Sequence, residues 1–351
     1  NTRYNTTEGT EFYATFIKNA GETKDSENLA LYLQAVASRT TKVKVTYLSD
    51  YSTEEFIVNG GTQVTRNINI TKAYADYDNT PGKLPTEQIT KCAIYVTSDN
   101  PISLYITNSL KNAYSGTCVL PTKALGKDYV VQTYLADKTS TEFAVVGTED
   151  MTSVTFNIQR TELDEDALSV DDGVFVDTVT YEEFNITLNR GEVFLYLSNK
   201  AEVGISGTRI CADKPIAVFN GNQFARIPYF KDENQTHLST QTYPIDRWGK
   251  QYVVTPTLKN DKEHVRITAF ENNTIIQKNG SFLCKLNAFE TYQDTIYACS
   301  NYYQASNPAA CFLYTLTSGA LNNHVAGRPS MTPITPLEYA TNSLLFATFT
   351  S

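Results

Sequence analysis

The sequence predicts an all-β protein built from tandem β-sandwich-like repeats, three related units in a row. The first observation is a short phrase, Gly followed by two polar residues and an aromatic one, at residues 9–14, 126–131 and 249–254. The second is the alternation of apolar and polar residues in many short runs, as at Val64–Ile70, which is typical of strands with one buried face. The third is the clustering of Gly, Pro, Asn and Asp between these runs, which favours turns. Together they predict roughly twenty short strands.

Other segments repeat in the same order as the phrase. Pro121 and Pro244 each stand five residues before the Gly of the second and third copies. Residues 98–105 and 212–219 share a Pro-Ile pattern, and residues 307–312 resemble both. Chance does not explain several similar segments that keep their order and approximate spacing. The repeat therefore indicates successive copies of one folding unit.

Each copy is long enough to bury its own core. The predicted domains are residues 1–125, 126–248 and 249–351, the last of them shorter and closed by a C-terminal strand. Residues 342–347 resemble a fading fourth copy of the phrase. A terminal strand that completed a neighbouring sheet would merge the three units into two larger domains, and the sequence leaves this alternative open.

Composition narrows the class of protein. The formal net charge is −9, and charged residues make up 19% of the chain. This argues against nucleic acid as a partner, because phosphate-backbone binding needs clustered Lys and Arg. Apolar runs such as Leu29–Val36, which Gln34 interrupts, are too short to span a membrane. With 23 Tyr and 17 Phe against one Trp, the chain resembles a soluble β-protein that is secreted or displayed at the cell surface.

The six cysteines carry little chemistry that the sequence can identify. None belongs to a Cys-x-x-Cys pair, which disfavours a zinc site or a thioredoxin-like redox motif. If a disulfide exists, Cys299 and Cys311 are the first pair to expect, because they flank a strand connection. Buried free thiols that pack as small apolar side chains are the alternative.

Two connections are longer than the repeat requires, residues 72–88 and 223–239. The second is an insertion, because the distance from Pro215 to Pro244 exceeds that from Pro101 to Pro121 by nine residues. Loops held by a rigid scaffold often carry binding residues, although a passive surface excursion fits the sequence equally well. The candidate binding residues on these two connections are aromatic rings and one histidine: Tyr74, Tyr77, Tyr229, Phe230 and His237.

No metal or catalytic motif stands out. The acidic run Glu162–Asp166 with Asp171 and Asp172 is either a structural calcium site or a solvated surface, and it lacks EF-hand spacing. His264 and His324 have no neighbour at metal-ligand spacing. The chain has no Gly-x-Ser-x-Gly, phosphate-binding loop or His-Glu-x-x-His. We therefore predict no catalytic residue, no metal and no cofactor.

Several segments taken in order resemble the N-terminal domain of IgGFc-binding proteins. The likeness extends from about residue 9 to the end of the chain and rests on the ordered set, since no single piece is specific. The resemblance implies an extracellular module of the kind found in mucus-associated animal proteins and in surface or secreted proteins of gut bacteria. The low cysteine count favours a bacterial member. The segments are Gly9–Phe12, Lys214–Asn222, Tyr243–Pro244, Trp248–Val254 and Pro329–Met331.

The resemblance implies a non-catalytic adhesion or recognition module. Its partner would be a host or matrix glycoprotein, such as a mucin or the Fc part of immunoglobulin, or glycans, held by the loops between strands. A structural spacer within a larger surface protein is the main alternative. A carbohydrate-active enzyme is a remote one, since it would need two facing carboxylates in a sugar-sized cleft.

Overall fold

The computed structural model describes residues 7–20, 22–76, 88–111, 113–134, 139–163, 176–198, 203–228, 236–257, 262–317, 328–341, 344 and 346. Strands dominate these residues, which confirms the all-β prediction. The described helices are one short α-helix, α1 (Ile70–Ala73), and the single 3₁₀ turns η2 (Thr122–Ala124), η4 (Ile245–Arg247) and η6 (Leu337–Tyr339). No described helix has the length and apolar character needed to span a bilayer.

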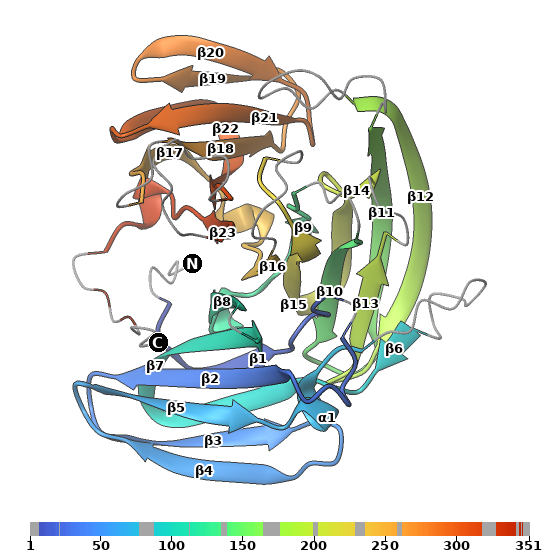
Figure 1. Ribbon diagram of the computed structural model, residues 1–351, viewed down its shortest axis with the longest axis vertical. Coiled ribbons are helices and arrows are strands. Elements are labelled where there is room, and N and C mark those ends of the chain that lie inside the picture. The colour runs from blue at the N-terminus through green and yellow to red at the C-terminus, as the bar shows by residue number, and fades with distance from the viewer. Residues whose placement is uncertain are drawn as a thin grey trace.

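The strands form three antiparallel sheets that curve around a common centre (Figure 1). Unit 1 holds β1 (Gly9–Ala14), β2 (Leu29–Ala37), β3 (Thr41–Tyr47), β4 (Thr53–Val58), β5 (Thr62–Ile68), β7 (Ile94–Leu110) and β8 (Ala113–Val119). Unit 2 holds β6 (Ile89–Thr90), β9 (Gly126–Val130), β10 (Thr141–Gly147), β11 (Thr152–Leu163), β12 (Val176–Leu188), β13 (Val193–Leu197), β14 (Val203–Gly204), β15 (Arg209–Ala225) and β16 (Thr236–Gln241). Unit 3 holds β17 (Gly249–Val254), β18 (Lys262–Ala269), β19 (Thr274–Lys278), β20 (Ser281–Leu286), β21 (Thr291–Tyr297), β22 (Asn301–Thr315) and β23 (Ser330–Pro333).

The three units have the same topology. In each unit one long strand, β7, β15 or β22, belongs to two layers at once. In unit 1 the first half of β7 lies between β1 and β3, with β4 outside β3, and we call this four-stranded part layer A. The second half of β7 lies between β8 and β2, with β5 outside β2, and this part is layer B. Units 2 and 3 repeat the arrangement around β15 and β22, which confirms the prediction of three related sandwich-like units.

The repeated phrases meet where the long strand passes from one layer to the other. Gly9 pairs with Ile102, Gly126 with Ile216 and Gly249 with Ala309, and each pairing has a register shift beside it. A proline, which cannot donate to the ladder, precedes each of these long-strand residues. The prolines are Pro101, Pro215 and Pro308. A strand that changes layer at such an irregularity forms the corner of a sandwich.

Tyrosine completes this corner in units 2 and 3. The buried Tyr129 hydroxyl accepts the N–H of Gly126 at 2.9 Å and donates to the carbonyl of Ile216 at 2.7 Å. Tyr252 makes the same two contacts, with Gly249 and Ala309. The hydroxyl thereby satisfies two backbone groups that the register shift leaves without ladder partners. This contact explains the Tyr three positions after the Gly in units 2 and 3, whereas unit 1 has the buried ring of Phe12 at this position.

The glycine itself is required by close packing. A Cβ on Gly9, Gly126 or Gly249 would lie 2.3, 2.5 or 2.3 Å from the Cβ of Pro121, Pro244 or Pro336. That proline precedes the 3₁₀ turn at the end of the same unit. The contact joins the beginning of each unit to its end. The five residues from Pro121 to Gly126, and from Pro244 to Gly249, then connect the end of one unit to the beginning of the next.

Apolar cores fill both the sandwiches and the boundaries between units. One core within unit 3 includes Val265 and Tyr303. Another lies between units 2 and 3 and includes Leu238 and Phe312. The core of unit 1 continues to Phe219 on the outer face of unit 2. Whether the predicted domain boundaries mark independently folding pieces stays a prediction.

The expected disulfide is absent. All six cysteines have free thiols. Cys311 is buried in the core of unit 3, whereas Cys299 is exposed after β21. Alternation along β22 turns Cys311 toward the sandwich interior, away from the exposed turn. The pairing prediction was wrong for this reason.

We expect Gly126→Ala to lower the free energy of unfolding by about 2 kcal/mol, because the added methyl group would overlap Pro244 in a packed corner. Urea denaturation monitored by circular dichroism measures the change. The control is Gly61→Asn, at a turn with φ of 76° and no atom within 4 Å of the new Cβ. It should cost less than about 1 kcal/mol. Equal losses in the two variants would show that the contact with proline does not determine stability.

Candidate functional site

The candidate histidine lies in the interior and not in a loop. β16 begins at Thr236, so His237 is a strand residue, and its side chain is 1% exposed. Its Nδ1 lies 2.5 Å from the hydroxyl of Ser115 on β8. Its Nε2 lies 3.4 Å from Oε1 of Glu142 on β10, whose side chain is fully buried. Units 1 and 2 therefore share a polar trio at their boundary, with Glu142 and His237 buried and Ser115 half-buried.

Burial controls the protonation of this trio. Loss of solvation lowers the pKa of His237 to about 3, against a weaker opposing effect of the Lys18 backbone. Loss of solvation also raises the pKa of Glu142 well above its ordinary value, and the positive charge of Lys18 opposes this shift. Both shifts favour the uncharged forms, a protonated Glu142 carboxyl and a neutral His237 imidazole. Lys18 itself pairs with Asp76 at 3.3 Å.

The trio does not have the polarity of a hydrolase triad. In a Ser-His-Asp triad the acid faces Nδ1 and the nucleophile faces Nε2 of the histidine. Here Ser115 faces Nδ1 and Glu142 faces Nε2. The lowered pKa of His237 also disfavours the imidazolium that such chemistry requires. The arrangement fits a buried structural contact between two uncharged groups.

The candidate Tyr74 is also buried. It follows α1, and its hydroxyl accepts the N–H of Asn19 at 2.7 Å and donates to the carbonyl of Glu22 at 3.0 Å. Desolvation raises the pKa of Tyr74. These bonds hold the segment after β1, and Ala20 donates from there to the carbonyl of Gln223 in unit 2 at 2.9 Å. Tyr74 therefore fixes one unit against the next.

Neither Tyr74 nor His237 is available for direct contact with a macromolecule in this structure. The other three candidates, Tyr77, Tyr229 and Phe230, lie outside the described residues. Most of the acidic stretch considered for calcium lies outside them as well. Among the residues that are described, no group of three His, Cys, Asp or Glu side chains is placed to hold a metal.

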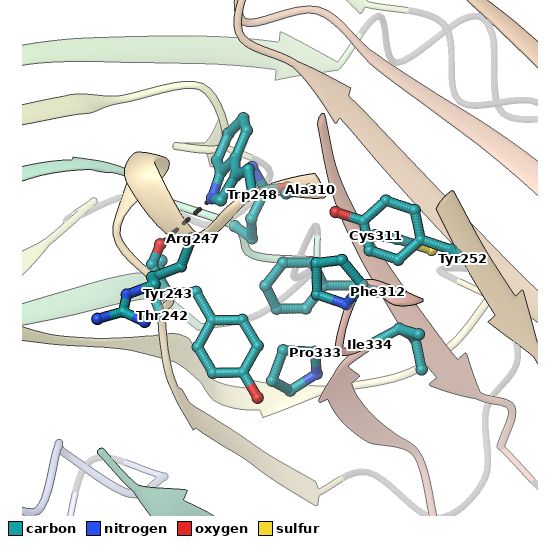
Figure 2. Close-up of a pocket in the computed structure, with 12 residues that line it drawn as sticks. Thr242, Tyr243, Arg247, Trp248, Tyr252, Ala310, Cys311, Phe312, Pro333 and Ile334 are labelled. Atoms are coloured by element: carbon teal, nitrogen blue, oxygen red, sulfur yellow. Dashed lines mark hydrogen bonds between the residues drawn. The ribbon is translucent and has the colours of Figure 1, made fainter. Parts of the chain in front are cut away.

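The edge strands of layer B meet at the centre of the molecule. Residues of β8, β16 and β23 line a cavity of about 250 Å³, and a smaller pocket beside it shares Tyr243 and Pro333 (Figure 2). The lining of the larger cavity is uncharged. Gln241 lies in this lining, with its Oε1 accepting the N–H of Leu120 at 2.6 Å and its Nε2 without a partner in the described part of the chain. Such a cavity suits ordered water or a small neutral molecule.

Comparison with known proteins places the chain in a family. A family model described as IgGFc binding protein matches residues 115–351. The chain belongs to the IgGFc-binding protein family. The match begins in β8 and covers units 2 and 3, including Ser115, Glu142 and His237. The resemblance inferred from the sequence is confirmed.

A human protein named IgGFc-binding protein is also similar. It is 23% identical over 256 residues, which cover 72% of this chain. The chain spans 4% of the length of that relative. The similarity therefore concerns one portion of a much longer protein.

The sequence analysis of this member of the IgGFc-binding protein family did not identify Glu142 or Ser115 as partners of His237. Glu142 stands near the start of β10, where a charged residue normally faces water. No sequence signal indicated that the outer face of β10 is covered by the preceding unit. The structure shows the same burial in unit 3, where His264 stands at the position equivalent to Glu142.

Replacing the carboxyl of Glu142 should change the pH dependence of stability. In the unfolded chain His237 loses its proton as the pH rises through about 6.5, and Glu142 is already ionised. In the folded chain His237 is neutral, and the raised pKa of Glu142 keeps one proton on its carboxyl. The free energy of unfolding should therefore fall above pH 6.5, by up to about 1.4 kcal/mol per pH unit. In Glu142→Gln the folded and unfolded histidines are both neutral above pH 6.5, so this loss should disappear.

Urea denaturation of both proteins between pH 5 and pH 8.5 measures the difference. In Glu142→Gln, stability should instead fall below pH 6.5, because only the unfolded histidine then gains a proton. Glu183→Gln, at an exposed site on β12, is the control and should follow the original profile. Parallel profiles for Glu142→Gln and the unmodified chain above pH 6.5 would contradict a protonated carboxyl at Glu142 in the folded protein.

Proposed function

We propose that this chain is an extracellular, non-catalytic module that recognises a host or matrix glycoprotein, such as a mucin or the Fc part of immunoglobulin. Membership in the IgGFc-binding family over residues 115–351 carries the proposal. The printed name of the human relative supports it as well. The connections between strands are the proposed contact regions.

The insertion between β15 and β16 is the first candidate. β15 ends at Ala225 and β16 begins at Thr236, and both strands lie within the sheet of unit 2. Buried His237 helps to hold the second end. Tyr229 and Phe230 belong to the connection between these fixed ends. Aromatic side chains provide large contact area at small entropic cost, which suits them to recognition.

The cavities do not favour catalysis. Neither the central cavity nor the pocket in Figure 2 has an Asp or Glu in its lining. A glycoside hydrolase would need a pair of carboxylates about the scissile bond. The linings of the cavity and the pocket are therefore consistent with a non-catalytic module.

Binding of the intact chain to immobilised immunoglobulin Fc and to purified mucin tests the function by surface plasmon resonance. The double variant Tyr229→Ala, Phe230→Ala should bind the recognised protein at least tenfold more weakly, since two aromatic contacts are lost. Tyr181→Ala removes an exposed ring from β12, 74% exposed, and should leave binding unchanged. Binding that is unaffected by the double variant would exclude this loop. A chain that binds neither protein would instead favour the spacer alternative.

A further inference from the structure

The outer face of layer A in unit 3 carries an uncharged row that crosses the whole layer. The register places Gln251 of β17 opposite Gln304 of β22, and Gln304 opposite Gln277 of β19. Gln277 is in turn opposite Phe282 of β20. The ring of Phe282 is 67% exposed, and Gln251 and Gln304 are exposed as well. Three amides and one aromatic ring thus lie side by side on a surface.

Apolar and hydroxyl side chains flank this row. On one side Val253 pairs with Tyr302, whose hydroxyl donates to Oε1 of Gln251 at 2.9 Å. On the other side Ile275 is 41% exposed, and its N–H donates to the hydroxyl of Ser306 at 2.9 Å. Lys285, opposite Ile275, borders the surface at one end. We call the surface formed by Gln251, Val253, Ile275, Gln277, Phe282, Tyr302 and Gln304 the amide platform.

The equivalent rows in the other units have a different chemistry. Each row begins two residues after the Gly of the repeated phrase, so the three can be compared position by position. The row in unit 1 is charged: Glu11, Thr97, Lys44 and Glu55. The row in unit 2 consists of smaller residues, of which Asp128 is charged and pairs with Arg209: Asp128, Cys211, Thr155 and Asn185. The scaffold therefore does not require amides and an aromatic ring, which are particular to unit 3.

We propose that the amide platform binds a neutral oligosaccharide. A side-chain amide offers both donors and acceptors, as sugar hydroxyl groups require, and an exposed ring packs against the apolar face of a sugar. The absence of charge along the row favours a neutral ligand. The inference deepens the proposed function, since the oligosaccharide would be the carbohydrate of the recognised glycoprotein.

The size of the platform also favours a small ligand. Strand spacing and rise give it sides of roughly 15 Å. Its area is then roughly 200 Å², well below the ~800 Å² that each partner buries in a stable protein complex. A chain of sugars needs only such a narrow surface.

Docking of a further unit of the same fold is the competing occupant. In unit 1 the pair Tyr13–Tyr95 is covered by Arg190 of unit 2, which donates to the Tyr13 hydroxyl at 2.6 Å. In unit 2 the residue at the position of Tyr95 is Arg209, and it lies against Phe270 of unit 3. The equivalent pair in unit 3 is Val253–Tyr302, and Val253 is 45% exposed.

Docking of a neighbouring unit would cover the Val253–Tyr302 flank of the platform. It would not cover the row of amides and Phe282. In unit 1 the equivalent row, which begins at Glu11, lies beside the interface with unit 2 and stays at the surface. Both Glu11 and Glu55 are exposed. The side chains that carry the proposal, Gln304 and Phe282, therefore lie outside the region that neighbouring units cover. A carbohydrate ligand remains the better match.

The test is binding of the full chain to a printed panel of neutral oligosaccharides, with their sialylated counterparts, followed by titration of the best binder. Phe282→Ala and Gln304→Ala should each weaken binding at least fivefold. The matched control Glu55→Ala alters the equivalent row of unit 1 and should leave binding unchanged. Because no ion pair is involved, the dissociation constant should change less than twofold between 50 and 500 mM NaCl.

The outcomes separate this inference from the proposed function. Loss of oligosaccharide binding in the platform variants supports it, even if Fc and mucin fail to bind the chain. Full binding of Phe282→Ala, binding of no oligosaccharide, or a preference for sialylated ligands that is abolished by salt would overturn it. Sedimentation that showed self-association abolished by Phe282→Ala, without oligosaccharide binding, would assign the platform to a second copy of the chain and overturn it as well. Binding of Phe282→Ala to enzymatically deglycosylated Fc or mucin, at the affinity of the unmodified chain, would leave the proposed function intact.

Discussion

The fold depends on a long strand that belongs to two layers and bends at a proline. Pro215 interrupts the ladder of β15, and the paired Gly126 with Tyr129 absorbs the register shift. Without that corner, layers A and B would be two separate sheets with unrelated orientations. The packing of Pro244 on Gly126 then ties the end of the unit to its beginning. Each repeated phrase in the sequence is one part of this corner, so repetition of the phrase implies repetition of the whole unit.

Much of this could be predicted, because strands and corners depend on local residue patterns. Alternation predicted the strands, and the Gly and Pro phrases predicted how many units there are. The position of His237 could not be predicted, since an insertion changes where the next strand begins. The burial of Glu142 could not be predicted either, because it depends on contacts with a unit distant in sequence. The amide platform was missed for the opposite reason: Gln251, Gln277 and Gln304 come from three separate segments, and only the strand register brings them together.

The units associate through one repeated contact. The segment that follows the first strand of a unit packs on the outer face of layer B in the next. Ala20 reaches Gln223 in this way, and the carbonyl of Thr133 accepts a bond from Arg266. Layer B therefore has two buried faces, one inside the sandwich and one against its neighbour. Glu142 and His264, at equivalent positions on that second face, are buried without lying in a sandwich core.

Different parts of a repeated scaffold are free to vary to different degrees. Corner residues are fixed by the fold, and the outer face of layer B is fixed by the neighbouring unit. The outer face of layer A is less constrained: in the described residues, neighbouring units contact its Tyr13–Tyr95 flank and the corresponding flank in unit 2. The three units use this freedom differently, with several charges in unit 1, smaller residues including one Asp in unit 2, and amides with an aromatic ring in unit 3. In unit 3 this face carries three of the exposed apolar side chains, Val253, Ile275 and Phe282, and the proposed oligosaccharide would cover them.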